Sequence, residues 1–333
     1  MKTKSARLYE FNKPLVVEEV DISPPLANWV TVKVYFSGIN FYEKLIIEGK
    51  YPTAAELPLT IGGEFSGEVV EVGEGVTDFK IGDRVFSLAM TGKSVSGGYA
   101  NFANIEEKYL YHLPEELSFE QGAAVPMVFF TAYTMLAKKV GMKDGQTVLV
   151  HSAAGGVGST LVKLIKAMYP NSKIIGTYSC AEKEAVVKKL GVDVPINSES
   201  SDLLTEIRTK FSDGIDVIFD PVGQKLVSEH LNLIKPLSGI WCTYGAYGGA
   251  IVEENLVGKL RSKNATLAGF LMWPLIENKK WCEKEFEEIF EILKQYKIEP
   301  QIDKVFPLEE VNQAFARISE RKNIGKVLLS CLE

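Results

Sequence analysis

A glycine-rich turn is the segment of this chain whose residue types point most directly to chemistry. In VLVHSAAGGVGSTLVKLI an apolar strand leads into Gly155, Gly156 and Gly158, and a helix follows at once. Glycine lets the backbone approach a pyrophosphate, and the free N–H groups at a helix N-terminus favour its negative charge. Ala153 replaces the first glycine of a strict GxGxxG pattern. The turn predicts a dinucleotide site, and the alternative is a turn that only packs helix on sheet.

The next strand bears on which dinucleotide would bind. NAD sites usually place an acidic residue at the end of this strand, where it holds the ribose hydroxyls. KIIGTYSC instead ends in Ser179 and Cys180, no acid precedes Glu182, and Lys183 follows. Small polar groups beside a cation suit the additional phosphate of NADPH. We therefore expect NADPH, with Ser179 and Lys183 near that phosphate; the alternative for Lys183 is a solvated helix face.

A parallel sheet is needed to position these residues. Between residues 123 and 269, strands that are apolar throughout alternate with helices, which indicates a parallel sheet covered on both faces. A single helix is expected over 123–140. Residues 1–122 read as strands broken by closely spaced glycines, which favours a small antiparallel barrel. The fold class predicted is therefore α/β, with two domains.

Composition bounds the class of protein further. The 333 residues suggest about two domains, and 46% hydrophobic with 24% charged residues is typical of globular proteins. The net charge of −6 argues against a nucleic-acid partner. Four dispersed cysteines without a CxxC pair fit a reducing compartment. No secretory signal is visible, and the longest uncharged stretch, 123–137, is too short for a membrane span. We expect a cytoplasmic protein with no integral membrane span.

Six segments spread over nearly the whole chain resemble the medium-chain dehydrogenase/reductase superfamily. They are GINFYEKLIIEGKYP, PLTIGGEFSGEVVEVGEGV, IGDRVF, GGYANF, VLVHSAAGGVG and the closing IGKVLLS. Within the superfamily the chain is similar to zeta-crystallin-type quinone oxidoreductases, and most to the vesicle amine transport protein-like branch. The resemblance implies a GroES-like β-barrel catalytic domain over 1–122, completed by 270–333. It also implies an inserted Rossmann dinucleotide-binding domain over 123–269.

The resemblance also bears on whether a catalytic zinc is bound. Zinc-binding members carry a Cys where Asn40 stands, a His where Gly63 stands, and a second Cys near Met127. AMTGKSVSGGYANF likewise lacks the cysteines of their structural zinc lobe. Without thiolate or imidazole ligands a tetrahedral zinc cannot be held. We expect no metal, and a site that polarises its electrophile with hydrogen bonds.

Site residues follow from the same resemblance. It places Asn40 beside the nicotinamide and Tyr51 in the substrate cleft, and both are the candidate catalytic hydrogen-bond donors to the acceptor. Related enoyl-thioester reductases use a tyrosine at the position of Tyr51 to donate a hydrogen bond or proton. The alternatives are that Asn40 caps a turn and that Tyr51 is a half-buried aromatic. Two departures are Leu45, where many quinone reductases have a second Tyr, and Ser198, where many have a Tyr beside the cofactor phosphate. The complete set expected to bind cofactor is Asn40, Thr131, Gly155, Gly156, Val157, Gly158, Ser179, Cys180, Lys183, Ser198, Tyr244, Gly245, Phe270 and Asn323.

The function expected is a zinc-independent, NADPH-dependent oxidoreductase that transfers hydride to quinones or α,β-unsaturated carbonyls. One alternative is an enoyl-thioester reductase. Another is a weakly catalytic, vesicle-associated interaction protein, although no lipidation motif or basic amphipathic helix is visible. The resemblance implies a homodimer formed by edge strands near 264–270. We expect His151 to be structural or cofactor-lining, and Cys242 to be a small core residue.

Overall fold

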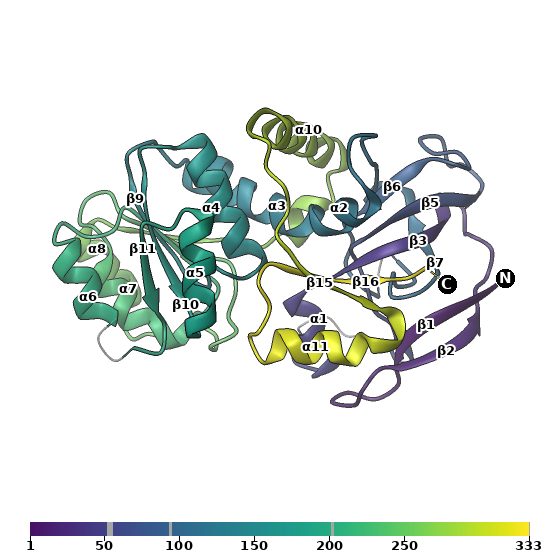
Figure 1. The fold of residues 1–333 in the computed structure, drawn as a ribbon, viewed down its shortest axis with the longest axis horizontal. Helices are drawn as coiled ribbons and strands as arrows, with labels where there is room; N and C mark the ends of the chain where they lie inside the picture. Colours follow the sequence, from purple (N-terminus) through teal and green to yellow (C-terminus); the bar gives the residue numbers. More distant parts are fainter. Residues whose placement is uncertain (52–55, 93–94, 201–202, 333) are drawn as a thin grey trace. The chain divides into compact units, whose positions relative to one another are not determined.

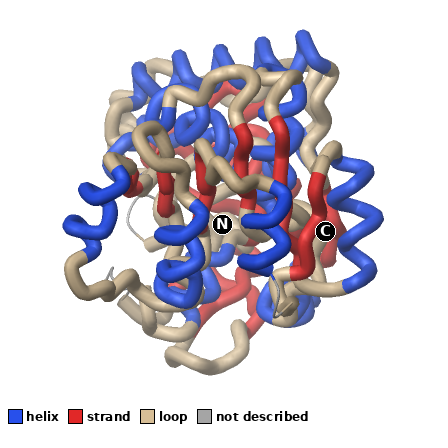
Figure 2. Tube along the Cα trace, turned by 90° about the vertical axis from the view of Figure 1, so that its left-hand side faces the viewer, coloured by secondary structure: helices blue, strands red, loops and turns tan. Residues whose placement is uncertain are grey.

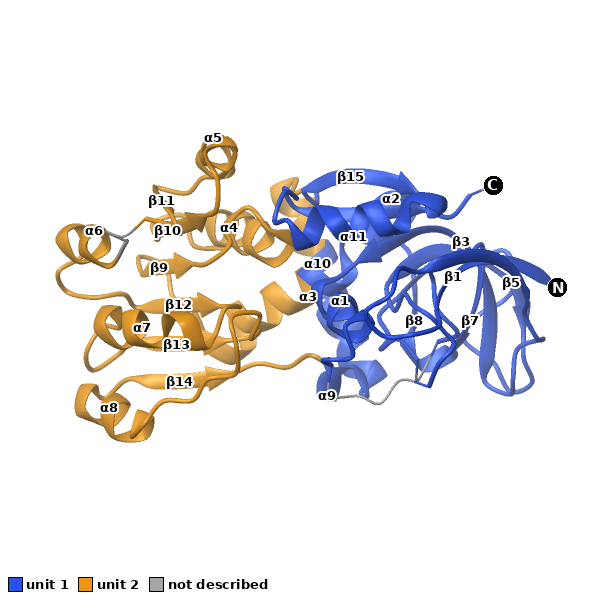
Figure 3. Ribbon diagram, turned by 90° about the horizontal axis from the view of Figure 1, so that it is seen from below, with its two compact units in different colours: residues 1–128, 273–290, 299–333 blue, residues 129–272, 291–298 orange. Residues whose placement is uncertain are grey.

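Short apolar strands in the middle of the chain form a six-stranded parallel sheet. Strands buried on both faces favour Val, Ile and Leu at successive positions. Their bounds are β9 Thr147–Val150, β10 Lys173–Tyr178, β11 Val194–Asn197, β12 Val217–Asp220, β13 Ile240–Thr243 and β14 Thr266–Gly269. The order in space is β11-β10-β9-β12-β13-β14 (Figure 3). From β9 the chain adds β10 and β11 on one side, and then returns to add β12, β13 and β14 on the other side. Open α/β sheets bind ligands at such a switch point, here between β9 and β12.

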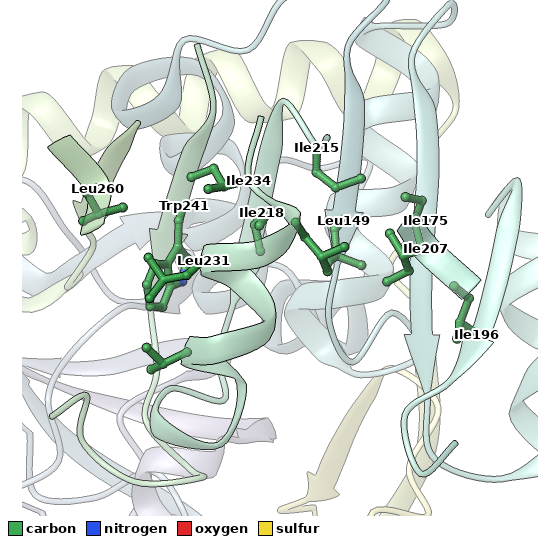
Figure 4. Packing of buried hydrophobic residues seen from close by; sticks show 12 residues of the cluster. Leu149, Ile175, Ile196, Ile207, Ile215, Ile218, Leu231, Ile234, Trp241 and Leu260 are labelled. Carbon is green, nitrogen blue, oxygen red and sulfur yellow. The ribbon is translucent and has the colours of Figure 1, made fainter. Parts of the chain in front are cut away.

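Helices lie on both sides of these strands (Figure 2). They are α4 Gly156–Met168, α5 Ala181–Leu190, α6 Leu203–Lys210, α7 Val227–Leu233 and α8 Leu256–Lys263, with a 3₁₀ turn Gln224–Leu226 before α7. Leu149, Ile218 and Trp241 from the strands pack in one apolar cluster with residues of α6, α7 and α8 (Figure 4). Helices α4 and α5 contact β9, β10 and β11 on the side away from that cluster (Figure 1). The sheet is therefore covered on both faces, as expected.

Antiparallel strands dominate the remainder of the chain. The strands are β1 Lys2–Leu8, β2 Val16–Asp21, β3 Trp29–Ile39, β4 Leu59–Thr60, β5 Phe65–Val72, β6 Arg84–Ser87, β7 Phe102–Glu106, β8 Leu110–His112, β15 Ile302–Pro307 and β16 Lys326–Ser330. One sheet has the order β2-β1-β4, and the other has the order β15-β16-β3-β5-β6-β8 with β7 paired to β3. The helices are α1 Phe41–Ile47, α2 Phe119–Ala124, α3 Pro126–Tyr133, α9 Trp273–Ile276, α10 Lys279–Tyr296 and α11 Val311–Ser319, with 3₁₀ turns at Glu107–Tyr109 and Leu308–Glu310.

The single helix predicted over 123–140 is wrong in its bounds. Helix α2 ends at Ala124, α3 begins at Pro126, and a π-helical segment, Thr134–Val140, follows. Proline has no N–H to continue the preceding helix, so it starts a new one instead. Gly141, in the left-handed conformation at φ 61°, ends the segment.

The computed structural model describes residues 1–51, 56–92, 95–200 and 203–332. The chain divides into two compact units (Figure 3). Unit 1 comprises Met1–Val128, Trp273–Phe290 and Glu299–Glu333, and unit 2 comprises Phe129–Met272 and Glu291–Ile298. The assignment of a catalytic domain to residues 1–122 with 270–333, and of a dinucleotide-binding domain to residues 123–269, stays a prediction. Over the described ranges, no helix combines the length and the apolar character needed to span a bilayer.

Candidate active site

The glycine turn of unit 2 joins strand β9 to helix α4. Ser152 adopts the left-handed conformation at φ 54°, and its carbonyl accepts the Gly155 N–H at 2.8 Å. A Cβ atom on Gly158 would lie 2.1 Å from the same carbonyl oxygen, so only glycine fits there. Gly155 precedes the helix and has no side chain to cap it. The N–H groups of the first turn of this 13-residue helix therefore suit an anionic ligand such as pyrophosphate.

The residues predicted to bind the additional phosphate of NADPH follow strand β10. Ser179 and Cys180 are partly buried, and Cys180 is the residue before helix α5. The Lys183 side chain is buried, so its alternative interpretation as a solvated helix face is wrong. Ser198 follows β11, is exposed, and donates its N–H to the Tyr178 carbonyl at 2.7 Å. These residues come from the ends of two neighbouring parallel strands.

The structure places the other predicted cofactor residues as follows. Tyr244 and Gly245 follow β13, and Phe270 follows β14 and donates its N–H to Thr243 at 2.9 Å. Since parallel strands end at one edge of a sheet, these residues share that edge with the glycine turn, whose Val157 is in the first turn of α4. Thr131 is buried in α3, with its Oγ1 3.9 Å from Met272 Sδ. Asn323 belongs to unit 1, where its Nδ2 donates to the Gly325 carbonyl at 2.9 Å.

A buried charged cluster surrounds Asn40 in unit 1. The Lys326 ammonium lies 2.5 Å from Glu64 Oε2 and also donates to Asn40 Oδ1. Asn40 Nδ2 donates to Glu64 Oε2 at 2.9 Å and more weakly to the Gly38 carbonyl at 3.4 Å. Asn40 also begins α1 in a reciprocal capping box with Glu43. The Asn40 amide is therefore oriented by unit 1 itself, through both its oxygen and its NH2 group.

Glu43 is a second buried carboxyl group in this part of unit 1. It accepts hydrogen bonds from Tyr99 Oη at 2.5 Å, from the Asn40 N–H at 2.9 Å and from the Gly63 N–H at 3.2 Å. Burial raises the pKa of Glu43 to about 7, although these donors and the Lys326 charge pull it down. The fold thus holds a carboxyl group that titrates near neutral pH beside the Asn40 turn.

An aromatic group surrounds the hydroxyl of Tyr51. The Trp273 Nε1–H donates to Tyr51 Oη. The ring of Tyr42 lies 5.5 Å from that of Tyr51 and 4.9 Å, edge-on, from that of Trp273. Burial raises the pKa of Tyr51 above its usual value near 10, so the phenol is protonated at neutral pH. Because the oxygen accepts from Trp273, the phenol proton is left to donate to another group.

The three positions that hold zinc in related dehydrogenases do not fit a zinc ion here. The Asn40 amide is bound to an ammonium and a carboxylate, and the Met127 N–H donates to Glu64 Oε1 at 2.7 Å. A Cβ atom at Gly63 would lie 2.0 Å from the Ala89 carbonyl oxygen, which leaves no room for an imidazole. Across the described parts of the chain, no three His, Cys, Asp or Glu residues gather as metal ligands would.

Several site residues were missed by sequence reasoning. They are Glu43, Glu64, Tyr99, Trp273 and Lys326. Two of them carried a signal, because Lys326 stands in the apolar strand KVLLS and Glu64 between glycines and Phe65. A charge in a segment destined for burial implies a buried partner. Nothing in the sequence indicated that Trp273 bonds Tyr51.

Comparison with known proteins gives matches along most of the chain. The families described as "Alcohol dehydrogenase GroES-like domain" and "Zinc-binding dehydrogenase" match residues 26–115 and 190–329. The chain is 33% identical over 316 residues to the synaptic vesicle membrane protein VAT-1 homolog of Danio rerio, covering 90% of this chain and 64% of that protein. It is 31% identical to the quinone oxidoreductase of Rattus norvegicus, covering 98% and 97% of the two chains.

A solved structure extends the likeness to the fold. The Escherichia coli quinone oxidoreductase, determined in complex with NADPH, superimposes with a TM-score of 0.89 at 27% identity, covering 99% of this chain and all of that one. The predicted fold class, a GroES-like unit with a Rossmann-like parallel sheet, is thereby confirmed.

Proposed function

This chain belongs to the quinone oxidoreductases of the medium-chain dehydrogenase/reductase superfamily, and from that premise we propose that it is an NADPH-dependent oxidoreductase that reduces quinones or α,β-unsaturated carbonyls without zinc. The observation that carries the proposal is the turn at the start of α4, where Gly158 allows the helix N-terminus to approach Ser152. It stands at the switch point of the parallel sheet, where such sheets bind nucleotides.

The proposed cofactor site uses the edge of the sheet in unit 2. NADPH supplies the hydride when it is bound. In the proposed arrangement, the turn from Gly155 to Gly158 holds the pyrophosphate, and Ser179 and Lys183 select the additional phosphate. Tyr244, Gly245 and Phe270 belong to the same edge, and Thr131, Asn40 and Asn323 complete the proposed set. We further propose a cytoplasmic homodimer that pairs through β14, the edge strand of the parallel sheet.

Tyr51 is the proposed proton donor to the acceptor. Hydride addition to a quinone or enone leaves negative charge on an oxygen, and a donor aimed at that oxygen lowers the barrier. Trp273 Nε1–H is directed at Tyr51 Oη, which leaves the phenol proton for the substrate. The oxygen takes that proton as the phenol O–H bond breaks, and solvent restores it afterwards. The ring of Tyr42 supplies an aromatic neighbour for a planar acceptor.

A cofactor and acceptor screen tests this function. The purified protein is mixed with NADPH or NADH and with ortho-quinones, para-quinones, enals and a crotonyl thioester, and its metal content is measured in parallel. We expect NADPH oxidation by quinones or enals in metal-free protein, and Lys183→Glu should raise the KM for NADPH far more than that for NADH. No oxidation with any acceptor, or activity proportional to bound metal, contradicts the proposal.

Enoyl-thioester reduction is the second candidate. The observation that favours it is the same proton available on Tyr51, because an enolate formed from a thioester needs an acid more than a quinone does. Losing one donor of this kind lowers kcat by about 10²–10³. If Tyr51→Phe shows that loss with the crotonyl thioester but only a small change with quinones, the thioester is the better substrate class. A similar loss with every acceptor favours the quinone and enone assignment.

A further inference from the structure

A chain of buried polar groups crosses unit 2 beneath the glycine turn. The Ser152 N–H donates to Thr177 Oγ1 at 3.1 Å, and this hydroxyl lies 3.2 Å from His151 Nδ1. The Nε2 atoms of His151 and His230 are 3.0 Å apart. Thr177, His151 and His230 are 2%, 3% and 0% exposed, so water cannot replace these partners. The chain therefore runs from the turn into the interior of the sheet.

The other end of this chain is a carboxylate at the end of β12. His230 Nδ1 faces Asp220 Oδ2 at 3.5 Å, and the same oxygen accepts the Trp241 Nε1–H at 3.0 Å. Asp220 Oδ1 accepts the N–H groups of Val222 and Gly223 at 2.7 and 3.0 Å. Asp220 therefore fixes the loop that follows β12 and, through His230, is coupled to the turn that follows β9.

One proton arrangement satisfies the hydrogen bonds between the two rings and Thr177, whereas His230 Nδ1 makes no hydrogen bond and only faces the Asp220 carboxylate. Two nitrogens 3.0 Å apart need one N–H and one lone pair between them. Asp220 favours a proton on His230 Nδ1, because the reverse order would aim a lone pair at the carboxylate. His230 Nε2 is then the acceptor, His151 donates from Nε2, and His151 Nδ1 accepts the Thr177 hydroxyl proton. Both rings are neutral in this arrangement.

This chain joins the two sides of the switch point. His151 and Thr177 belong to the β9 and β10 side, whereas Asp220 and Trp241 belong to the β12 and β13 side. The residue it fixes on the first side is Ser152, whose left-handed backbone turns the chain toward the glycines. The Ser152 carbonyl in turn accepts the Gly155 N–H at 2.8 Å. The Ser152 N–H bond to Thr177 Oγ1 is thus the end of the chain at the glycine turn, and the Ser152 hydroxyl has a further contact with Tyr247 Oη at 2.9 Å.

We propose that His151 and His230 are positioning residues for the dinucleotide: their Nε2–H···Nε2 bond, anchored by Asp220 and Thr177, holds Ser152 and hence the glycine turn in the geometry that binds pyrophosphate. The inference rests on the proposed dinucleotide function and not on the identity of the electron acceptor. The two histidines touch neither substrate nor cofactor in this role, and act through the backbone of the turn.

Titration of the NADPH dissociation constant tests this role. Thr177→Val keeps the shape of the side chain and removes the hydroxyl, Thr177→Ser restores it, and His230→Leu removes the acceptor for His151. We expect Thr177→Val and His230→Leu each to raise the Kd by about tenfold or more, as the loss of a buried hydrogen bond does. Thr177→Ser should stay close to wild type, and kcat at saturating NADPH should change far less than the Kd.

Coupling between the two sites separates positioning from a merely structural effect. Both single variants break the same chain of hydrogen bonds. The double variant Thr177→Val with His230→Leu should therefore bind NADPH no more weakly than whichever single variant binds it less tightly. Multiplying losses would overturn the inference. His112→Leu is the matched control. It changes the third histidine of the chain, which lies in unit 1, and it should leave the Kd for NADPH unchanged.

Nitrogen-15 NMR of imidazole-labelled protein provides a second measurement that does not need the variants to fold. We expect the proton of His230 on Nδ1 and that of His151 on Nε2. The same tautomer at both rings would overturn the inference. Wild-type protein that binds neither dinucleotide refutes the proposed function and this inference with it. Tight wild-type binding that Thr177→Val and His230→Leu leave unchanged refutes this inference alone.

Discussion

Replacing Lys326 by Met tests the buried ion pair of unit 1. The Lys326 ammonium and the Glu64 carboxylate are 3% and 0% exposed, with 2.5 Å between Nζ and Oε2. Met fills nearly the same volume without a charge, so the variant leaves the carboxylate inside the protein. Glu64 would keep the N–H of Met127 at 2.7 Å and the Asn40 amide at 2.9 Å, but no cation. The perturbation thus removes one charge and the hydrogen bond that Lys326 donates to Asn40 Oδ1.

The size of the effect follows from the distance and the burial. At an effective dielectric constant of about 20, unit charges at this separation attract by about 6–7 kcal/mol. Part of this attraction offsets the desolvation of both ions, and breaking one partner of such a pair costs about 3–5 kcal/mol. We therefore expect Lys326→Met to lower the free energy of unfolding by about 3–5 kcal/mol.

Urea unfolding at pH 7, followed by far-UV circular dichroism, measures this loss. The double variant Lys326→Met with Glu64→Gln removes both charges and keeps an oxygen for the Met127 N–H, so it should be more stable than Lys326→Met alone. Lys2→Met is the matched control, because the Lys2–Glu19 pair is equally close, at 2.6 Å, but exposed to solvent. Its midpoint should not change. A Lys326→Met variant within about 1 kcal/mol of wild type, the range of surface pairs, would refute the reasoning.

Three further changes test other parts of the structure. Gly158→Ala places a Cβ atom 2.1 Å from the Ser152 carbonyl, so we expect a loss of about 1–3 kcal/mol in thermal unfolding and weaker dinucleotide binding; an unchanged melting temperature would contradict the close packing. Burial lowers the pKa of His151 to about 4, so its stabilising contribution is present above pH 6.5 and is lost as the pH falls toward 4. Between pH 8 and pH 5, the free energy of unfolding of wild type should therefore fall by about 2 kcal/mol relative to that of His151→Gln, as measured by urea unfolding. A difference between the two proteins that does not change with pH would exclude a neutral buried imidazole. Glu43 has the opposite sign, because its pKa is raised to about 7 and its contribution, present below pH 4.5, is lost as the pH rises through 7. Between pH 5 and pH 8, the free energy of unfolding of wild type should fall by about 2 kcal/mol relative to that of Glu43→Gln, measured in the same way. A difference between the two proteins that does not change with pH would show that Glu43 stays ionised.

The parts of this protein that could be predicted from sequence are those encoded locally. Strands such as TVLV and VIFD are apolar throughout because both faces are covered, and the glycines after β9 mark a turn whose backbone leaves no room for a side chain. Helix α1 was missed although Asn40 and Glu43 form its capping box, since a short helix after a long strand has little periodicity of its own. The division of 123–140 depends on Pro126, which lacks the N–H needed to continue α2 and so begins α3.

The buried networks could not be predicted, because they join residues that are distant in sequence. Glu64 and Lys326 are 262 residues apart, and the two histidines of unit 2 are 79 apart. A lysine in an apolar strand implies that a partner exists, but it does not say which carboxylate is folded against it. The Tyr51–Trp273 bond spans 222 residues in the same way. Long-range pairing of this kind needs the fold.

The charge around Asn40 bears on which acceptors suit the proposed site. Lys326 and Glu64 neutralise one another, and the Lys326 ammonium is committed to Asn40 and Glu64 rather than to a ligand. In the proposed mechanism the acceptor oxygen therefore meets a neutral donor, the Tyr51 phenol, and not a cation. A neutral donor stabilises a localised alkoxide less than a cation does, whereas the charge on a reduced quinone or an enolate is already spread over several atoms. In the proposed mechanism, the arrangement of unit 1 thus favours acceptors that delocalise the incoming electron pair over simple aldehydes and ketones, and this preference follows from Lys326 and Glu64 as much as from Tyr51.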